Sequence, residues 1–191
     1  MKFAVIGFYF FSGLFLALSA SASSMMPISL EQLSTRASII FYGEVVSNEV
    51  QRDSQSGQLV TFTTFNVLES IKGNTTSTHT IKQLGGKDPE ANINLRIYGI
   101  PEFQTNNRYV IFLPEKSSIG FSSPLGLHQG SFSVTTENGE LMISNGRSLI
   151  SPTSNTAPNK SVQMPLAGNS RKPSQARLED FINTVRTYNT P

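Results

Sequence analysis

The chain has 191 residues, with no cysteine, no tryptophan and only two histidines, His79 and His128. Without cysteine there can be no disulfide, thiolate nucleophile, cysteine-based metal site or lipid-modified N-terminal cysteine. A zinc site needs two or three histidines or carboxylates that converge, usually with one close spacing such as H-x-x-x-H. Neither histidine has such a neighbour in the sequence, so we expect both to be solvated or hydrogen-bonded surface residues.

Charged residues are also few, at 15% of the chain, and the formal net charge is only +2. Lysine and arginine are scattered, and the only adjacent pair is Arg171 and Lys172. So small a net charge does not attract a polyanion over long distances. We therefore expect no nucleic-acid partner.

Complete catalytic motifs are missing as well. The serine-hydrolase pattern G-x-S-x-G is incomplete at Gly120–Pro124, which lacks the second glycine, and Gly126–Gly130 carries His128 in place of serine. The three aspartates form no calcium-loop pattern. No catalytic, cofactor-binding or metal-ligating residue is predicted. A small hydrolase, or a metal-assisted enzyme that uses His79 or His128, remains an alternative.

The one long hydrophobic run lies at the start of the chain. Lys2 precedes Phe3–Leu18, in which Ser12 is the only serine or threonine, and small residues follow through Ser23. This order is typical of a secretory signal peptide cleaved after Ala22. An uncleaved anchor is the alternative, but the run is shorter than the roughly 20 apolar residues that span a bilayer. We expect residues 1–22 to be a signal peptide, and the mature protein to be secreted or periplasmic without stable membrane insertion.

The apolar pattern of residues 23–150 predicts one β-rich domain. Ser29 and Gln32 have the spacing of a capping box, which begins a short helix. Strands are expected at Ile39–Val46, Leu59–Ile71, Thr78–Leu84, Ile93–Tyr98, Arg108–Leu113, Ser131–Thr135 and Glu140–Ile143. The strand Leu59–Ile71 has apolar groups on both faces, as in a strand that curls around a barrel.

The sequence after residue 150 divides into two parts. Residues 151–174 are rich in proline, serine and asparagine, which predicts a linker or a long surface loop. Residues 175–188 are predicted to form a helix capped by Ser174. Its apolar stripe, Leu178, Phe181, Ile182 and Val185, should pack on the barrel or on the first helix.

These elements predict a mainly β fold. We expect an OB-like, partly closed antiparallel barrel with a short N-terminal helix and a C-terminal helix. An open sandwich is the alternative. Phe103 and Phe121 lie on predicted loops, and together with Gln129 they are the residues expected to contact a partner.

Two segments resemble the first half of a netrin-type module, as found in the tissue inhibitors of metalloproteinases. Ser38–Val46 follows a short helix and forms an apolar first strand, and Phe65–Gly73 ends in a Lys-Gly turn. The middle of the chain resembles a family of uncharacterised exported bacterial proteins. That resemblance lies in four segments, Gly85-Gly86, Gly99–Phe103, Tyr109–Leu113 and Gly126–Phe132.

What the resemblance implies is the barrel, not the inhibitory site. Those inhibitors chelate the protease zinc through an N-terminal cysteine, whereas this chain would begin at Ser23 after cleavage. Fold alone does not determine function. We expect an exported, non-enzymatic protein-binding module whose partner is another exported or surface protein, a secreted protease among the candidates. A structural envelope protein, with residues 151–174 as a tether, is the alternative.

Overall fold

The protein is described here by a computed structural model, which covers residues 26–146 and 174–190. The predicted signal peptide lies outside these residues, as does the predicted linker through residue 173. The elements are α1 (Leu30–Arg36), β1 (Ile39–Arg52), β2 (Leu59–Lys72), β3 (Thr78–Leu84), β4 (Gly86–Asp88), β5 (Ile93–Leu95), β6 (Arg108–Leu113), the 3-10 helix η1 (Leu127–Gly130), β7 (Ser131–Glu137), β8 (Glu140–Ser144), β9 (Ala176–Arg177) and α2 (Leu178–Thr187). Among the described residues, no helix has the length and apolarity needed to cross a membrane.

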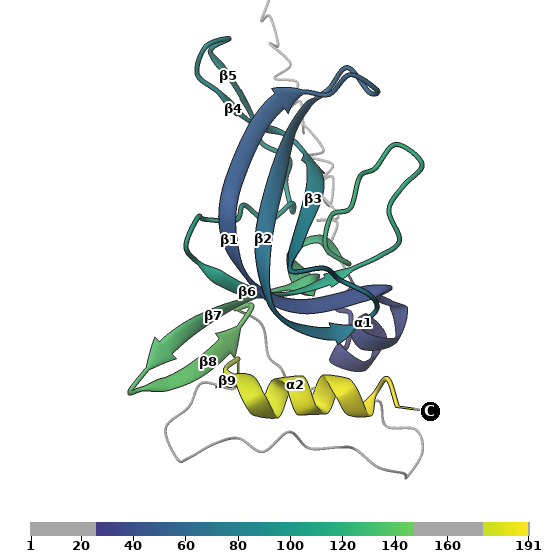
Figure 1. The fold of residues 1–191 in the computed structure, drawn as a ribbon, viewed down its shortest axis with the longest axis vertical. Coiled ribbons are helices and arrows are strands. Elements are labelled where there is room, and N and C mark those ends of the chain that lie inside the picture. Colours follow the sequence, from purple (N-terminus) through teal and green to yellow (C-terminus); the bar gives the residue numbers. More distant parts are fainter. Residues whose placement is uncertain (1–25, 147–173, 191) are drawn as a thin grey trace, which may run out of the picture.

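Seven strands form one antiparallel sheet in the order β3-β2-β1-β6-β7-β8-β9, and β4 pairs with β5 in a separate hairpin (Figure 1). The mainly β prediction, with a helix toward each end, is confirmed. However, the edge strands β3 and β9 do not pair with each other, so the described sheet is not closed into a barrel.

The long strands β1 and β2 curve because their pairing is irregular. Register shifts between Ile40 and Phe41, Tyr42 and Gly43, and Val45 and Ser47 mark bulges, which bend a strand and increase its twist. β1 pairs with β6 only as far as Glu44, and beyond that point it pairs with β2 alone. The upper parts of β1, β2 and β3 therefore form a lobe that extends past the rest of the sheet (Figure 1).

Helix α1 begins where its capping box predicts. The Ser29 hydroxyl accepts a hydrogen bond from the Gln32 amide at 3.1 Å, and the Gln32 side chain accepts one from the Ser29 amide at 3.1 Å. These reciprocal bonds satisfy two backbone donors that the first turn leaves free.

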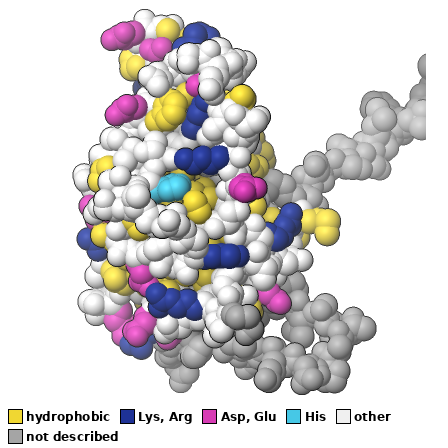
Figure 2. All heavy atoms as spheres, turned by 45° about the vertical axis from the view of Figure 1, so that its right-hand side comes forward, with side chains coloured by type: hydrophobic (Ala, Val, Ile, Leu, Met, Phe, Trp, Pro, Cys, Tyr) yellow, Lys and Arg dark blue, Asp and Glu magenta, His cyan; other side chains and the backbone are white. Residues whose placement is uncertain are grey.

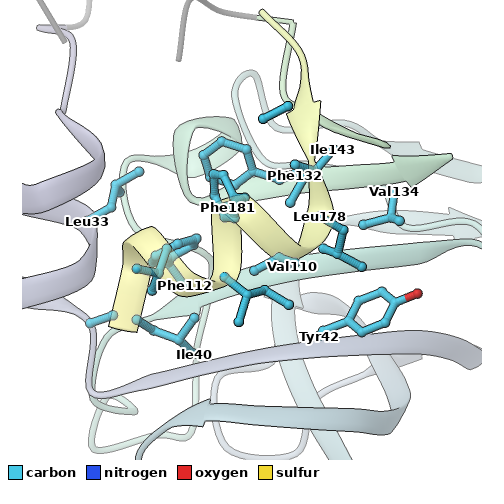
Figure 3. Packing of buried hydrophobic residues seen from close by; sticks show 14 residues of the cluster. Leu33, Ile40, Tyr42, Val110, Phe112, Phe132, Val134, Ile143, Leu178 and Phe181 are labelled. Atoms are coloured by element: carbon cyan, nitrogen blue, oxygen red, sulfur yellow. The ribbon is translucent and has the colours of Figure 1, made fainter. Parts of the chain in front are cut away.

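The largest core cluster lies between α2 and the sheet. Figure 3 shows Phe181 of α2 beside Phe112 and Phe132, with ring centroids at 6.2 and 4.8 Å. The predicted apolar stripe of α2 is buried in this cluster, so the stripe packs as expected. The predicted cap Ser174 is wrong: α2 begins at Leu178, because the preceding Ala176 and Arg177 pair with β8 as strand β9.

A second core cluster occupies the other face of β1 and β6. It contains Phe41, Val45, Phe65, Ile81, Phe103, Tyr109, Ile111 and Leu113. Residues of β1 alternate between the two clusters, Ile40 and Tyr42 in the first and Phe41 in the second, as the two-residue period of a strand requires. The second cluster is the base on which the candidate site rests.

Two segments that contain glycine lie at the ends of strands. An Asn-Gly pair between two strands predicts a tight primed turn, and Asn138 and Gly139, with φ of 52° and 79°, join β7 to β8 in that way. β3 ends at Leu84, as predicted, directly before Gly85-Gly86. The chain nevertheless continues as the β4–β5 hairpin, so the predicted strand Ile93–Tyr98 is shortened to Ile93–Leu95.

Candidate functional site

A cleft of about 370 Å³ lies between the upper lobe of the sheet and the β4–β5 hairpin with the segment that follows it. We call it the Gln83 cleft. Its floor consists of Asn48 and Val50 of β1, Thr61 and Thr63 of β2, and Gln83 of β3. Its opposite wall comes from residues 85–87, 94–97 and 100–103.

Three polar floor side chains donate hydrogen bonds inside the fold. The Thr63 hydroxyl donates to Asn48 Oδ1 at 2.7 Å, and Asn48 Nδ2 donates to the Phe103 carbonyl at 2.9 Å. The Thr61 hydroxyl donates to the Gly85 carbonyl at 2.7 Å. Two of these bonds, to the carbonyls of Phe103 and Gly85, join the opposite wall to the sheet.

Gln83 differs from its neighbours on the floor. Its side chain lines the cleft and is only 3% exposed. Its Nε2 nonetheless has no hydrogen-bond partner among the described residues. A buried donor without an acceptor costs about 1–3 kcal/mol, so native proteins rarely keep one.

Gly85 and Gly86 bring the hairpin close to the floor. Their φ values are 97° and 147°, which L side chains rarely adopt. A Cβ at Gly86 would lie 2.7 Å from Thr61 Oγ1 and 2.7 Å from Val50 Cγ1. Glycine is therefore required for the narrow approach between β4 and the sheet.

The outer rim combines an aromatic residue with an ion pair. Tyr98 is 95% exposed and lies in a turn closed by the Ile100 amide, which donates to the Ile97 carbonyl at 3.2 Å. Arg96 donates two hydrogen bonds to the carboxylate of Glu102, at 2.7 and 3.1 Å. The ion pair bridges the two sides of this turn, and so it helps to hold Tyr98 at the edge of the cleft.

Phe103 is not the exposed contact that the sequence suggested. It is 7% exposed, and its ring packs edge-on against Phe65 and Tyr109 at 5.2 and 5.0 Å. The reason is a contact with a residue far away in the sequence. Asn48 Nδ2 donates a hydrogen bond to the Phe103 carbonyl and holds this loop against the second core cluster. Phe103 closes one end of the cleft instead of offering a free ring.

Gln129 is likewise buried, at 3% exposure. Its Oε1 accepts a hydrogen bond from the Ile28 amide at 2.8 Å, and its Nε2 donates to the Met26 carbonyl at 3.3 Å. It therefore fixes the segment before α1 instead of facing solvent. Phe121 is half-buried, with Lys82 Nζ 4.7 Å from its ring centroid. The structure does not bring the three predicted contact residues together, and their role in partner binding stays a prediction.

A second polar cluster lies at Lys82, whose position in β3 places it on the face opposite Gln83. Lys82 Nζ lies 2.7 Å from Asp53 Oδ1 and donates to the Ile119 carbonyl at 2.8 Å. Hydrogen bonds from Lys82 and Ser56 lower the pKa of Asp53 from 3.8 to about 2. Through these contacts Lys82 joins the loops at Asp53 and Ile119 to the sheet.

The two histidines lie in different surroundings. His79 was expected on the surface, but it is half-buried against the Phe41 ring at 5.2 Å. Burial, with a smaller contribution from Lys116, lowers its pKa. His128 is exposed. Within residues 26–146 and 174–190, no three histidine or acidic side chains gather in a way that could hold a metal ion.

Charges of both signs are mixed over the face shown in Figure 2, with most of that surface formed by uncharged groups. No protein-family model matches the chain, and no curated protein matches it. The functional inference therefore starts from the residues of the Gln83 cleft. The sequence contained one indication of this site: Gln83 is two residues from the buried Ile81 and thus on the same face of its strand.

Proposed function

We propose that this protein is an exported, non-enzymatic binding module that engages another exported or surface protein through the Gln83 cleft. The observation that carries the proposal is the buried Gln83 amide without a partner, at the floor of a cleft of about 370 Å³. Such a cleft falls in the size range of ligand sites, which are mostly apolar with a few placed polar groups.

The unpartnered amide favours a binding role over a purely structural one. In a structural core, an apolar side chain at this position would avoid the cost of burying a free donor. A ligand that brings an acceptor into the cleft would remove that cost. A buried donor without a partner at the floor of a cleft therefore supports a binding role for Gln83.

Tyr98 supports a protein as the partner. A tyrosine that is 95% exposed, on a turn braced by an ion pair, is available for contact at the rim. Tyrosine is among the residues that most often dominate binding energy at protein interfaces. Ile97 and Ile100, which flank Tyr98 and Gly99 in the sequence, line the cleft itself. One partner could therefore contact both Tyr98 and the cleft.

The resemblance to netrin-type modules adds a finer proposal about fold and partner. The curved sheet would be an opened relative of the OB-like barrel, and a secreted protease is one candidate partner. Inhibition through a zinc-chelating N-terminal cysteine is unsupported, since the expected mature N-terminus is Ser23. Edman sequencing of the exported protein would test that N-terminus, and Met1 would contradict it.

Site-specific cross-linking tests the proposed function. A photo-reactive phenylalanine analogue placed at Tyr98 should capture a partner from the exported protein fraction. The same analogue at Ile119, which is exposed but does not line the cleft, is the matched control. The captured protein, once purified, should bind the mature chain with a fixed stoichiometry. Capture at both positions, or no stoichiometric complex, would contradict the proposal.

A further inference from the structure

The floor of the Gln83 cleft has little free hydrogen-bonding capacity. The Asn48 Nδ2 and the hydroxyls of Thr61 and Thr63 already donate within the fold, and Gln83 Nε2 is the floor donor without a partner. On the floor, this buried amide is therefore the one donor left for a ligand acceptor. A sugar ring, which presents several hydroxyls, would find only this one free donor on the floor.

Apolar and polar groups contribute about equally to the surface of the cleft, with Lys87, Asn94, Arg96 and Glu102 as polar side chains of the opposite wall. The apolar part has two sources. Val50 lies on the floor, and Leu95, Ile97, Ile100, Pro101 and Phe103 belong to the opposite wall. Phe103 cannot provide a stacking platform for a sugar, because its ring is packed against Phe65 and Tyr109. The apolar surface suits an aliphatic side chain of a ligand.

Charge restricts the ligand further. None of the floor side chains is ionisable, and the charged residues that line the cleft lie on the opposite wall, at Lys87, Arg96 and Glu102. Arg96 and Glu102 neutralise each other. A charged group at the floor would lose its hydration without meeting an opposite charge, which is unfavourable.

From these features we infer that the Gln83 cleft binds an uncharged peptide segment, with a main-chain carbonyl on Gln83 Nε2 and an adjacent aliphatic side chain against Ile97 and Ile100. The inference rests on the proposed function and names the chemistry of its ligand. One carbonyl flanked by an apolar side chain matches a floor with one free donor and the apolar side chains of Ile97 and Ile100 on the opposite wall. Tyr98 contacts the same segment where it leaves the cleft.

The test begins with a phage-displayed library of random decapeptides selected on the mature protein, residues 23–191. Enriched peptides should share a short uncharged stretch with an aliphatic residue. An enriched peptide is then synthesised with a fluorophore and titrated by fluorescence anisotropy. Gln83→Met, which keeps the length but removes the donor, should weaken its affinity roughly tenfold.

Gln51→Met is the matched control. Gln51 follows Val50 in β1, so its side chain points to the other face of the strand, and it is exposed. The same chemical change there should leave the affinity unchanged. A second readout needs no substitution: the side-chain amide resonances of Gln83 in the unmutated protein should shift when the peptide is added.

The possible failures have distinct meanings. Enriched peptides that bind Gln83→Met as well as the unmutated protein would overturn the cleft assignment while leaving protein binding intact. The same holds if a cross-linked partner binds but no peptide is enriched, since a folded surface would then be recognised. Binding of a probe oligosaccharide such as chitohexaose, weakened by Gln83→Met, would overturn both the inference and the proposed function.

Discussion

Lys82 Nζ lies 2.7 Å from Asp53 Oδ1, and each of these side chains is only 8% exposed. The ammonium also donates to the Ile119 carbonyl, so one lysine joins β3 to the turn after β1 and to the loop before η1. This pair lies on the back of the strand that carries Gln83, and it holds the edge of the lobe that forms the cleft.

Breaking this pair should destabilise the protein. Asp53→Asn leaves a buried ammonium without its counter-charge, which is costly, whereas the double variant Asp53→Leu with Lys82→Met removes both charges. We expect the double variant to be more stable than the single one in urea unfolding. Glu102→Gln is the control: Arg96 and Glu102 are 75% and 61% exposed, and this change should alter stability by no more than about 0.5 kcal/mol. A single variant as stable as the wild type would show that the pair contributes nothing.

The same pair predicts how stability depends on pH. The pKa of Asp53 in the folded state, about 2, is below its ordinary value of 3.8. Its contribution to stability is therefore complete above about pH 4 and lost as the pH falls from there toward 2. Urea unfolding at several pH values should show a steeper acid loss for the wild type than for Asp53→Asn. Parallel curves for the two proteins would contradict the role of Asp53.

Gly86 should be required for the shape of the cleft. Gly86→Ala would place a Cβ 2.7 Å from Thr61 Oγ1, in addition to the strain of its positive φ. Gly57→Ala is the control, because Gly57 has φ of 68° with open space around it, and it isolates the strain of roughly 1–2 kcal/mol. Thermal unfolding should show a greater loss for Gly86→Ala, and amide exchange should show that β4 separates from the sheet. Equal losses would show that the close approach does not matter.

Gln129 should hold the segment before α1. Gln129→Ala removes both side-chain bonds to Met26 and Ile28 and should cost about 1–3 kcal/mol of stability. Hydrogen exchange at the Ile28 amide is the specific measurement, and its protection should fall markedly. Gln104→Ala, at an exposed position, is the control. Unchanged protection of Ile28 would contradict the anchoring role.

Features that depend on neighbouring residues could be predicted from the sequence. The capping box of Ser29 and Gln32 begins α1, and Asn138-Gly139 forms the turn between β7 and β8. The apolar stripe of α2 is buried because its spacing of i, i+3, i+4 and i+7 matches a helix that packs on one face. In each case the pattern that predicts the feature lies within a few residues along the chain.

Features that depend on distant residues were missed. The order of the sheet joins β1 to β6, and no local pattern shows that β3 and β9 remain apart. Phe103 is buried because Asn48, 55 positions earlier, binds its carbonyl. The strand alternation places Gln83 on the face of Ile81, but the sequence cannot show that β4 and β5 fold over it and leave its amide without a partner.

The central claim is that Gln83 is kept for binding and not for stability. The most direct test is the free energy of unfolding of Gln83→Met in urea, without ligand and beside Gln51→Met. Because methionine removes a buried donor that has no acceptor, we predict a stability equal to that of the wild type or up to about 1 kcal/mol higher. A fall of more than about 1 kcal/mol in Gln83→Met alone would mean that Gln83 supports the fold, and would contradict the claim.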